Sequence, residues 1–152
     1  MPEDEEKGVH HVVWCVHPES FPGLRSFWEG SAGLQLEELD LPDLGLKVLI
    51  SWEGGGEIMS PFYEKGALAQ DARRFLEERG EGVYTVVVNV RGIDALVTSL
   101  LDTGASLKFR ETISPDAVRQ RGLAKDSDFS ILQAGFDEVC GMSICLQEIV
   151  PT

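Results

Sequence analysis

The sequence predicts an α+β fold built from two βαβββ modules in tandem. The main observation is a repeat: the run GVHHVVWCV at residues 8–16 returns as GVYTVVVNV at residues 82–90, with five of nine positions identical. Both runs are rich in β-branched residues, which favour strands, and a recurring run indicates two copies of one supersecondary unit. In each half a stretch with helical spacing follows this strand, and shorter β-rich runs come after it.

Length and composition predict one globular domain. The chain has 152 residues, of which 43% are hydrophobic and 26% charged, as in soluble globular proteins. A chain of this length can bury one sizeable core, so we expect a single domain over residues 8–150. Module one covers about residues 8–62, a linker about 63–81 and module two about 82–150. Residues 1–7, MPEDEEK, are expected to form an acidic disordered tail.

In the first half, a strand is expected over residues 9–16 and an amphipathic helix over residues 18–32. The helix is indicated by Phe21, Leu24 and Trp28, which recur at three- and four-residue spacing. Three strands follow, over residues 34–39, 46–52 and 57–60. The linker that comes next contains a helical turn or two and ends at Gly80.

In the second half, a strand over residues 83–90 precedes a helix over residues 93–101 and a strand over residues 106–113. Residues 114–128 are polar without a clean period, so we expect a long loop there, and loops of that length are often functional. Two final strands are expected over residues 129–133 and 141–149. A turn around residues 135–138 separates them.

Charge and cysteine content exclude several classes of partner. The formal net charge is −13, and so acidic a surface repels phosphate backbones and anionic lipid, which excludes nucleic acid and membrane surfaces as partners. The three cysteines lack the CxxC spacing of a structural zinc site and are expected to be reduced thiols. No apolar run is long enough to span a bilayer, and the acidic start does not resemble a signal peptide, so we expect a cytoplasmic protein.

Strand alternation predicts one sheet face that is polar. Side chains two positions apart share a face, so His11, Val13 and Cys15 lie together on the first strand, and Glu57 and Met59 lie together on the fourth. The repeat places further polar residues on the matching face of the second half: Thr85 and Asn89, with Ser143, Cys145 and Gln147 on the last strand. If helices cover the other face, these residues line a concave small-molecule pocket.

Four segments carry a resemblance to a known family: GVHHVVWCV at residues 8–16, EIMSP at 57–61, FLEERGEGVYTVVVNV at 75–90 and GMSICLQE at 141–148. In these the chain resembles the vicinal oxygen chelate superfamily, which is glyoxalase-like and bleomycin-resistance-like, and within it the methylmalonyl-CoA epimerase-like members. The resemblance covers nearly the whole chain. It implies a cup-shaped mixed sheet with helices on the outside, a homodimer, and a divalent metal such as zinc at the floor of the cup.

The metal ligands that the resemblance implies are altered in this sequence. The four metal-ligand positions that the resemblance implies correspond to His11, Glu57, Thr85 and Cys145 in this sequence. Histidine, glutamate and a cysteine thiolate are competent zinc ligands, whereas the neutral threonine hydroxyl is a poor one. Two interpretations therefore stay open: zinc held by His11, Glu57 and Cys145 with an open fourth position, or a cup without a metal. We favour the second because half of the ligand set has changed.

Three functions follow from this reading. The first is an isomerase or lyase that moves a proton next to a carbonyl or in an acyl thioester, with His11 and Glu57 as catalytic acid and base. Its substrate-binding residues would be Val13, Met59, Thr85, Asn89, Ser143 and Gln147. The second is a metal-free protein that sequesters a small molecule, as resistance proteins do. The third, a ring-cleaving dioxygenase, is least favoured because such iron sites need two histidines and only His11 stands at a ligand position.

Overall fold

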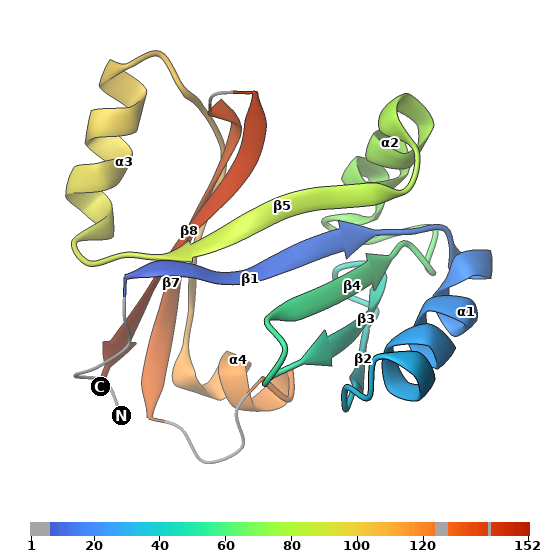
Figure 1. Ribbon diagram of the computed structural model, residues 1–152. Helices are drawn as coiled ribbons and strands as arrows, with labels where there is room; N and C mark the ends of the chain where they lie inside the picture. Colours follow the sequence, from blue (N-terminus) through green and yellow to red (C-terminus); the bar gives the residue numbers. More distant parts are fainter. Residues whose placement is uncertain (1–6, 124–127, 140) are drawn as a thin grey trace. The chain divides into compact units, whose positions relative to one another are not determined.

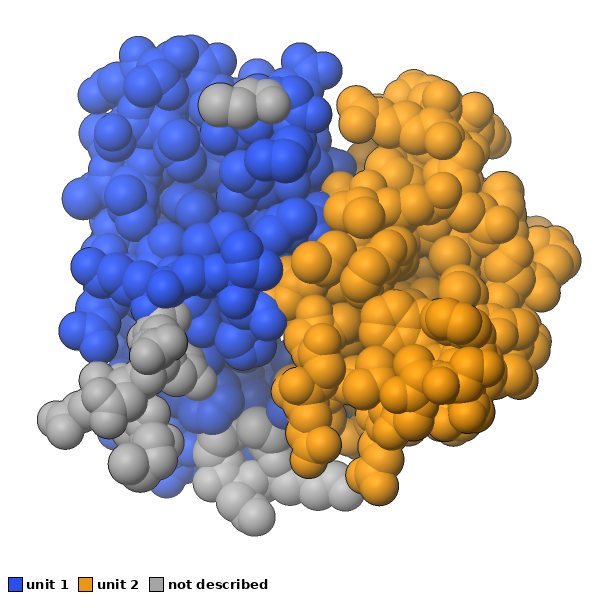
Figure 2. Space-filling view, in the orientation of Figure 1, with its two compact units in different colours: residues 1–10, 85–152 blue, residues 11–84 orange. Residues whose placement is uncertain are grey.

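The computed structural model describes residues 7–123, 128–139 and 141–152. The predicted tail, apart from Lys7, lies outside the described residues. The chain divides into two compact units, shown in different colours in Figure 2. We call residues 11–84 the middle unit, and residues 85–152 together with the first ten residues the terminal unit. No helix in the described ranges has the length and apolar character needed to cross a membrane.

The middle unit contains a four-stranded mixed sheet in the order β2-β3-β4-β1. Its strands are β1 (Gly8–Cys15), of which residues 11–15 belong to this unit, β2 (Glu37–Leu41), β3 (Leu46–Ser51) and β4 (Gly56–Ser60). The pairs β2/β3 and β3/β4 are antiparallel, whereas β1 and β4 are parallel, with Val13 opposite Glu57. The four strands lie near the predicted positions, although β2 starts three residues later than expected.

A helical stretch covers one face of this sheet (Figure 1). It consists of a 3-10 turn η1 (Pro18–Ser20), helix α1 (Phe21–Ser26) and a π-helical segment η2 (Phe27–Ser31), which confirms the helix predicted over residues 18–32. Phe21 packs with Leu49 and Ile58 in a buried cluster, and Trp28 packs against that cluster. The three- and four-residue spacing of the apolar side chains thus marks the face that the helix turns to the sheet.

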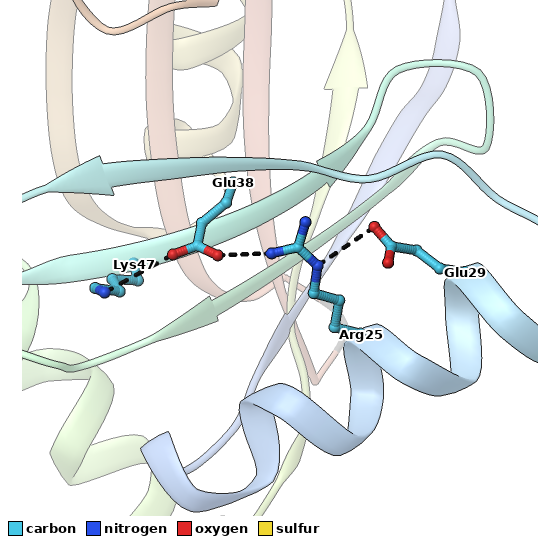
Figure 3. A network of polar contacts seen from close by, with 4 residues as sticks. All are labelled: Arg25, Glu29, Glu38 and Lys47. Atoms are coloured by element: carbon cyan, nitrogen blue, oxygen red, sulfur yellow. Dashed lines mark hydrogen bonds and ion pairs between the residues drawn. The ribbon is translucent and has the colours of Figure 1, made fainter.

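Polar contacts also connect these helices to the sheet (Figure 3). Arg25 of α1 donates from Nη1 to Glu38 Oε2 of β2 at 2.8 Å, and from Nε to Glu29 Oε1 of η2 at 3.3 Å. Nζ of Lys47 on β3 lies 3.7 Å from the other oxygen of Glu38. Because all four side chains are 30–39% exposed, each pair contributes little to stability, about 1 kcal/mol or less.

The predicted linker contains a longer helix than expected. Helix α2 (Ala69–Arg79) has eleven residues, of which Ala69, Ala72 and Leu76 are buried. It ends at Gly80, whose φ of 77° is a conformation that glycine adopts without strain. The burial of one helix face shows that α2 is a packed part of the middle unit, and the prediction of only a turn or two was too short.

The terminal unit has the same pairing pattern, with its strands in the order β6-β7-β8-β5. The strands are β5 (Gly82–Asn89), of which residues 85–89 belong to this unit, β6 (Ser106–Ile113), β7 (Phe129–Val139) and β8 (Met142–Pro151). The pairs β6/β7 and β7/β8 are antiparallel and β5/β8 is parallel. Helix α3 (Ile93–Asp102) packs Ile93 and Val97 against Phe136 and other buried side chains of one sheet face. The predicted α+β class with mixed strands is confirmed.

The long polar loop predicted over residues 114–128 is partly helical. Helix α4 (Pro115–Gln120) begins after Ser114, whose Oγ accepts a hydrogen bond from the backbone N–H of Ala117 at 3.2 Å. Proline suits the first helical position because its ring fixes a helical φ. It lacks a backbone N–H, but an N–H at this position would have no acceptor within the helix. Val118 is fully buried between Ile113 and Ile131, so this segment packs on the sheet and is not an open loop. Residues 124–127 lie outside the described residues.

The turn predicted around residues 135–138 is also wrong, because these residues belong to β7. Gly135 is needed for packing and not for a turn: a Cβ there would lie 2.2 Å from the ring of Phe109 on β6. The strand does distort after Phe136, where the pairing register with β8 shifts and Glu138 has a φ of 58°. The sequence of residues 135–138 resembles a turn, but Gly135 is at a close contact and Glu138 is at an irregularity within a strand.

Candidate functional site

His11 and Glu57 meet on one face of the middle unit. The parallel pairing of β1 with β4 places Val13 opposite Glu57, and His11 follows on the same face of β1 two residues away. Nε2 of His11 lies 3.1 Å from Oε2 of Glu57. The side chains are 14% and 22% exposed, so both are largely shielded from water but still reachable. An imidazole beside a carboxylate in such surroundings can hold and pass a proton.

The apolar neighbours of this pair are more deeply buried. Val13 is 5% exposed and Met59 is 4% exposed, and on this face Met59 lies opposite Cys15. These two predicted substrate-binding residues therefore form part of the packed interior beside His11 and Glu57. Side chains buried in this way exclude water, which strengthens electrostatic interactions beside them.

Helix α2 covers the same face farther along β1. Cys15 is fully buried, and its Sγ lies 3.8 Å from the carbonyl oxygen of Ala72. Burial, and after it the negative charges of Asp71 and Glu81, raise the pKa of the Cys15 thiol to about 12. The thiol therefore stays protonated at neutral pH and is a poor nucleophile. On the polar face predicted for this strand, His11 is partly exposed, whereas Cys15 is fully buried.

In the terminal unit, the predicted polar residues form hydrogen-bonded pairs between β5 and β8. Ser143 Oγ donates to Thr85 Oγ1 at 3.2 Å, and Gln147 Nε2 donates to Asn89 Oδ1 at 3.0 Å. Asn89 and Gln147 are 8% and 5% exposed. Strand alternation placed all four residues on one face, and the structure joins them in two pairs.

Gln133 of β7 extends this row, and the sequence had not indicated it. Its Nε2 donates to Gln147 Oε1 at 3.1 Å, so Gln147 links Gln133 to Asn89. The antiparallel register places Gln133 opposite Gln147. The predicted strand ended at residue 133, whereas β7 continues to Val139. With the full strand, alternation would have placed Gln133 on the same sheet face as Gln147. We call Thr85, Ser143, Asn89, Gln147 and Gln133 the polar row.

The three residues predicted to bind zinc are divided between the two units. His11 and Glu57 belong to the middle unit, whereas Cys145 belongs to the terminal unit, where it is 5% exposed and paired opposite Val87. Among the described residues there is no group of three or more His, Cys, Asp or Glu side chains that could hold a metal ion. A zinc site takes three or four protein ligands, of which the middle unit could supply two, His11 and Glu57.

Comparisons with solved structures show which fold this is. A hypothetical protein from Bacillus halodurans C-125 matches with a TM-score of 0.65 and 18% identity, over 95% of both chains. Methylmalonyl-CoA epimerase from Mycobacterium tuberculosis matches with a TM-score of 0.60 and 21% identity, over 95% of this chain and 88% of that one. A variant of the Streptomyces coelicolor methylmalonyl-CoA epimerase, in complex with 2-nitronate-propionyl-CoA, matches with a TM-score of 0.62 and 15% identity, over 93% and 96%.

The chain therefore has the vicinal oxygen chelate fold that these epimerases share, as its resemblance implied. No family model matches the sequence, and no curated protein matches it. At such low identities the likeness shows the fold alone, since one fold hosts many chemistries. Function has to be argued from the residues of the site.

Proposed function

We propose that this protein is an enzyme that transfers a proton at the carbon next to a carbonyl, an isomerase or lyase with an acyl thioester as substrate. The observation that carries the proposal is the 3.1 Å separation of His11 Nε2 and Glu57 Oε2 in a largely shielded position. A carboxylate and an imidazole in contact are a proton acceptor and a proton donor held ready for the same reaction.

Glu57 would act as the base. Its carboxylate would take the proton from the carbon beside the carbonyl, which breaks the C–H bond, forms an O–H bond and leaves an enolate. The His11 imidazole would position the carboxylate and share the proton, because it already lies at hydrogen-bonding distance from one carboxylate oxygen. Return of the proton to the same face of that carbon would restore the substrate, return to the opposite face after the enolate turns in the site would give the epimer, and return to another atom of the enolate system would give a rearranged product; each return leaves Glu57 ionised again.

An enolate needs hydrogen-bond donors or positive charge in order to form. Side-chain hydroxyl and amide groups can supply such donors. Four residues of the polar row, Thr85, Asn89, Ser143 and Gln147, carry hydroxyl or amide groups suited to this purpose. We keep them as proposed substrate-binding residues. Neutral donors stabilise an enolate less than a divalent ion does.

The substrate class is supported by what the structural neighbours bind. One is held in complex with 2-nitronate-propionyl-CoA and another with methylmalonyl-CoA, both acyl thioesters of coenzyme A. The C–H bond next to a thioester carbonyl is acidic, and a base such as Glu57 would take its proton.

A homodimeric assembly stays a prediction, which sedimentation equilibrium of the purified protein would test.

Deuterium uptake tests the proposal. The protein is incubated in D₂O with methylmalonyl-CoA and a panel of other 2-substituted acyl-CoA compounds, and exchange at the carbon beside the thioester is followed by proton NMR. We expect exchange with at least one compound and a loss of 100-fold or more in Glu57→Gln, since general-base catalysis typically contributes about 10²–10⁴. Glu53→Gln, which changes the same group at an exposed turn, is the matched control. Equal exchange in wild type and Glu57→Gln would reject Glu57 as the base.

A further inference from the structure

The middle unit has a cavity on the face opposite His11 and Glu57. Its volume is about 560 Å³, within the range of ligand pockets. Trp14 and Ile58 line it, and both alternate along their strands with residues of the His11 face, so the cavity lies on the helix-covered side of β1 and β4. The full lining is Trp14, Val16, Ser20, Gly23, Leu24, Trp28, Ile58, Glu81 and Gly82.

Two indole rings are part of the cavity wall. The ring centroids of Trp14 and Trp28 are 5.2 Å apart at an interplanar angle of 65°, an edge-to-face arrangement. Gly56 leaves room for them, because a Cβ there would lie 3.0 Å from the Trp28 ring and 3.4 Å from the Trp14 ring. Both tryptophans are only partly buried, so their rings remain reachable from the cavity.

The charge at the cavity is negative. Glu81 is the ionisable residue in the described lining, which includes no Lys or Arg. Its Oε1 accepts a hydrogen bond from Ser20 Oγ and its Oε2 accepts one from the backbone N–H of His17, each at 3.0 Å. These bonds fix the carboxylate but use only two of its roughly four acceptor positions. The net charge of −13 adds a long-range attraction for cations.

We propose that this cavity binds a small organic cation with an aromatic or apolar body, such as an arylalkyl ammonium ion. The apolar body would lie among Trp14, Trp28 and Leu24, and the ammonium group would meet the Glu81 carboxylate and the electron-rich indole faces. Tryptophan is the preferred side chain for cation–π contact. Anionic ligands, among them the phosphates of coenzyme A, would be repelled there. The inference does not depend on the proposed function of His11 and Glu57.

Three probes of one shape but different charge test the inference by isothermal titration calorimetry. They are tryptamine, which is a cation, tryptophol, which is neutral, and indole-3-acetate, which is an anion. We expect tryptamine to bind about fivefold or more tightly than tryptophol, and indole-3-acetate to bind most weakly. Shifts of the Trp14 and Trp28 indole N–H signals in the NMR spectrum should accompany tryptamine binding. No binding of tryptamine at millimolar concentration, or equal affinity for the cation and the anion, would overturn the inference.

Variants assign the effect to the cavity. Glu81→Gln should weaken tryptamine at least fivefold while tryptophol changes less than twofold, and Glu53→Gln, which removes one exposed charge outside the lining, should change neither. Gly56→Ala should weaken both tryptamine and tryptophol, because its methyl group displaces the Trp28 ring. If Glu81→Gln fails to fold, as judged by circular dichroism, the tryptamine-to-tryptophol ratio in the wild type still decides. Retained discrimination in a folded Glu81→Gln would refute the role of the carboxylate.

Discussion

Replacing Glu148 by alanine is expected to destabilise the terminal unit. Glu148 of β8 accepts hydrogen bonds from the first free backbone N–H groups of α3: Gly92 N at 3.0 Å and Ile93 N at 2.9 Å. The carboxylate also lies at the positive end of the helix dipole. Loss of such a cap costs about 1–2 kcal/mol, and the buried Ile93 amide left without its partner adds to this, so we expect about 2 kcal/mol in total.

Urea denaturation followed by circular dichroism measures the change in the free energy of unfolding. In a thermal scan, a loss of about 2 kcal/mol in a chain of this length corresponds to a fall in melting temperature of about 4–8 °C. Glu148→Gln keeps one acceptor oxygen and should lose only about half as much. The control is Glu78→Ala, an exposed residue of α2, which should change stability by less than about 0.5 kcal/mol. If Glu148→Ala is as stable as this control, the capping role is wrong.

Further substitutions, one alkylation reaction and one pH dependence test the packing and the buried groups. Gly135→Ala should cost about 2–3 kcal/mol through its clash with Phe109, and Phe109→Leu in the same chain should recover part of that loss, as denaturation of the double variant will show. Gln147→Leu should cost about 2–4 kcal/mol, because it removes the hydrogen-bond partner of Asn89 Oδ1, which is buried, and that of Gln133 Nε2, which is half-buried; Asn89→Leu combined with it should cost less than the sum. Cys15 should resist iodoacetamide at pH 9 in the native state and react once urea unfolds the chain, as peptide mass spectrometry will reveal. Since the native thiol has a pKa raised from 9.0 to about 12, stability from Cys15 is fully present below pH 9 and should fall as the pH rises toward 12, an effect that Cys15→Ala should remove.

The sequence predicted those elements whose periodicity is strong and whose ends are marked. β6 was expected at residues 106–113 and is found there, and α3 has the expected start at Ile93. Short polar elements were missed because their stability comes from tertiary contact: α4 depends on the burial of Val118. Gly135 resembled a turn residue, since nothing in the sequence reveals that the Phe109 ring lies against it.

Strand alternation predicted only those features of the site that depend on which sheet face a side chain occupies. Alternation and the resemblance together placed His11 near Glu57, and the distance between them agrees. Alternation did not indicate that α2 closes the same face at Cys15, because a helix far along the chain supplies that cover. The cavity beside Trp14 was missed for a related reason: apolar side chains with helical spacing predict a core, whether the packing is complete or leaves space.

A double-mutant cycle on deuterium exchange tests most directly whether His11 and Glu57 act as one proton-transfer couple. Exchange rates are measured with the same acyl-CoA compound for the wild type, His11→Asn, Glu57→Gln and the double variant. Residues that act as a unit are strongly non-additive, so the double variant should lose no more than the worse single variant. Losses that multiply, or a His11→Asn variant as fast as the wild type, would contradict the couple that the 3.1 Å contact suggests.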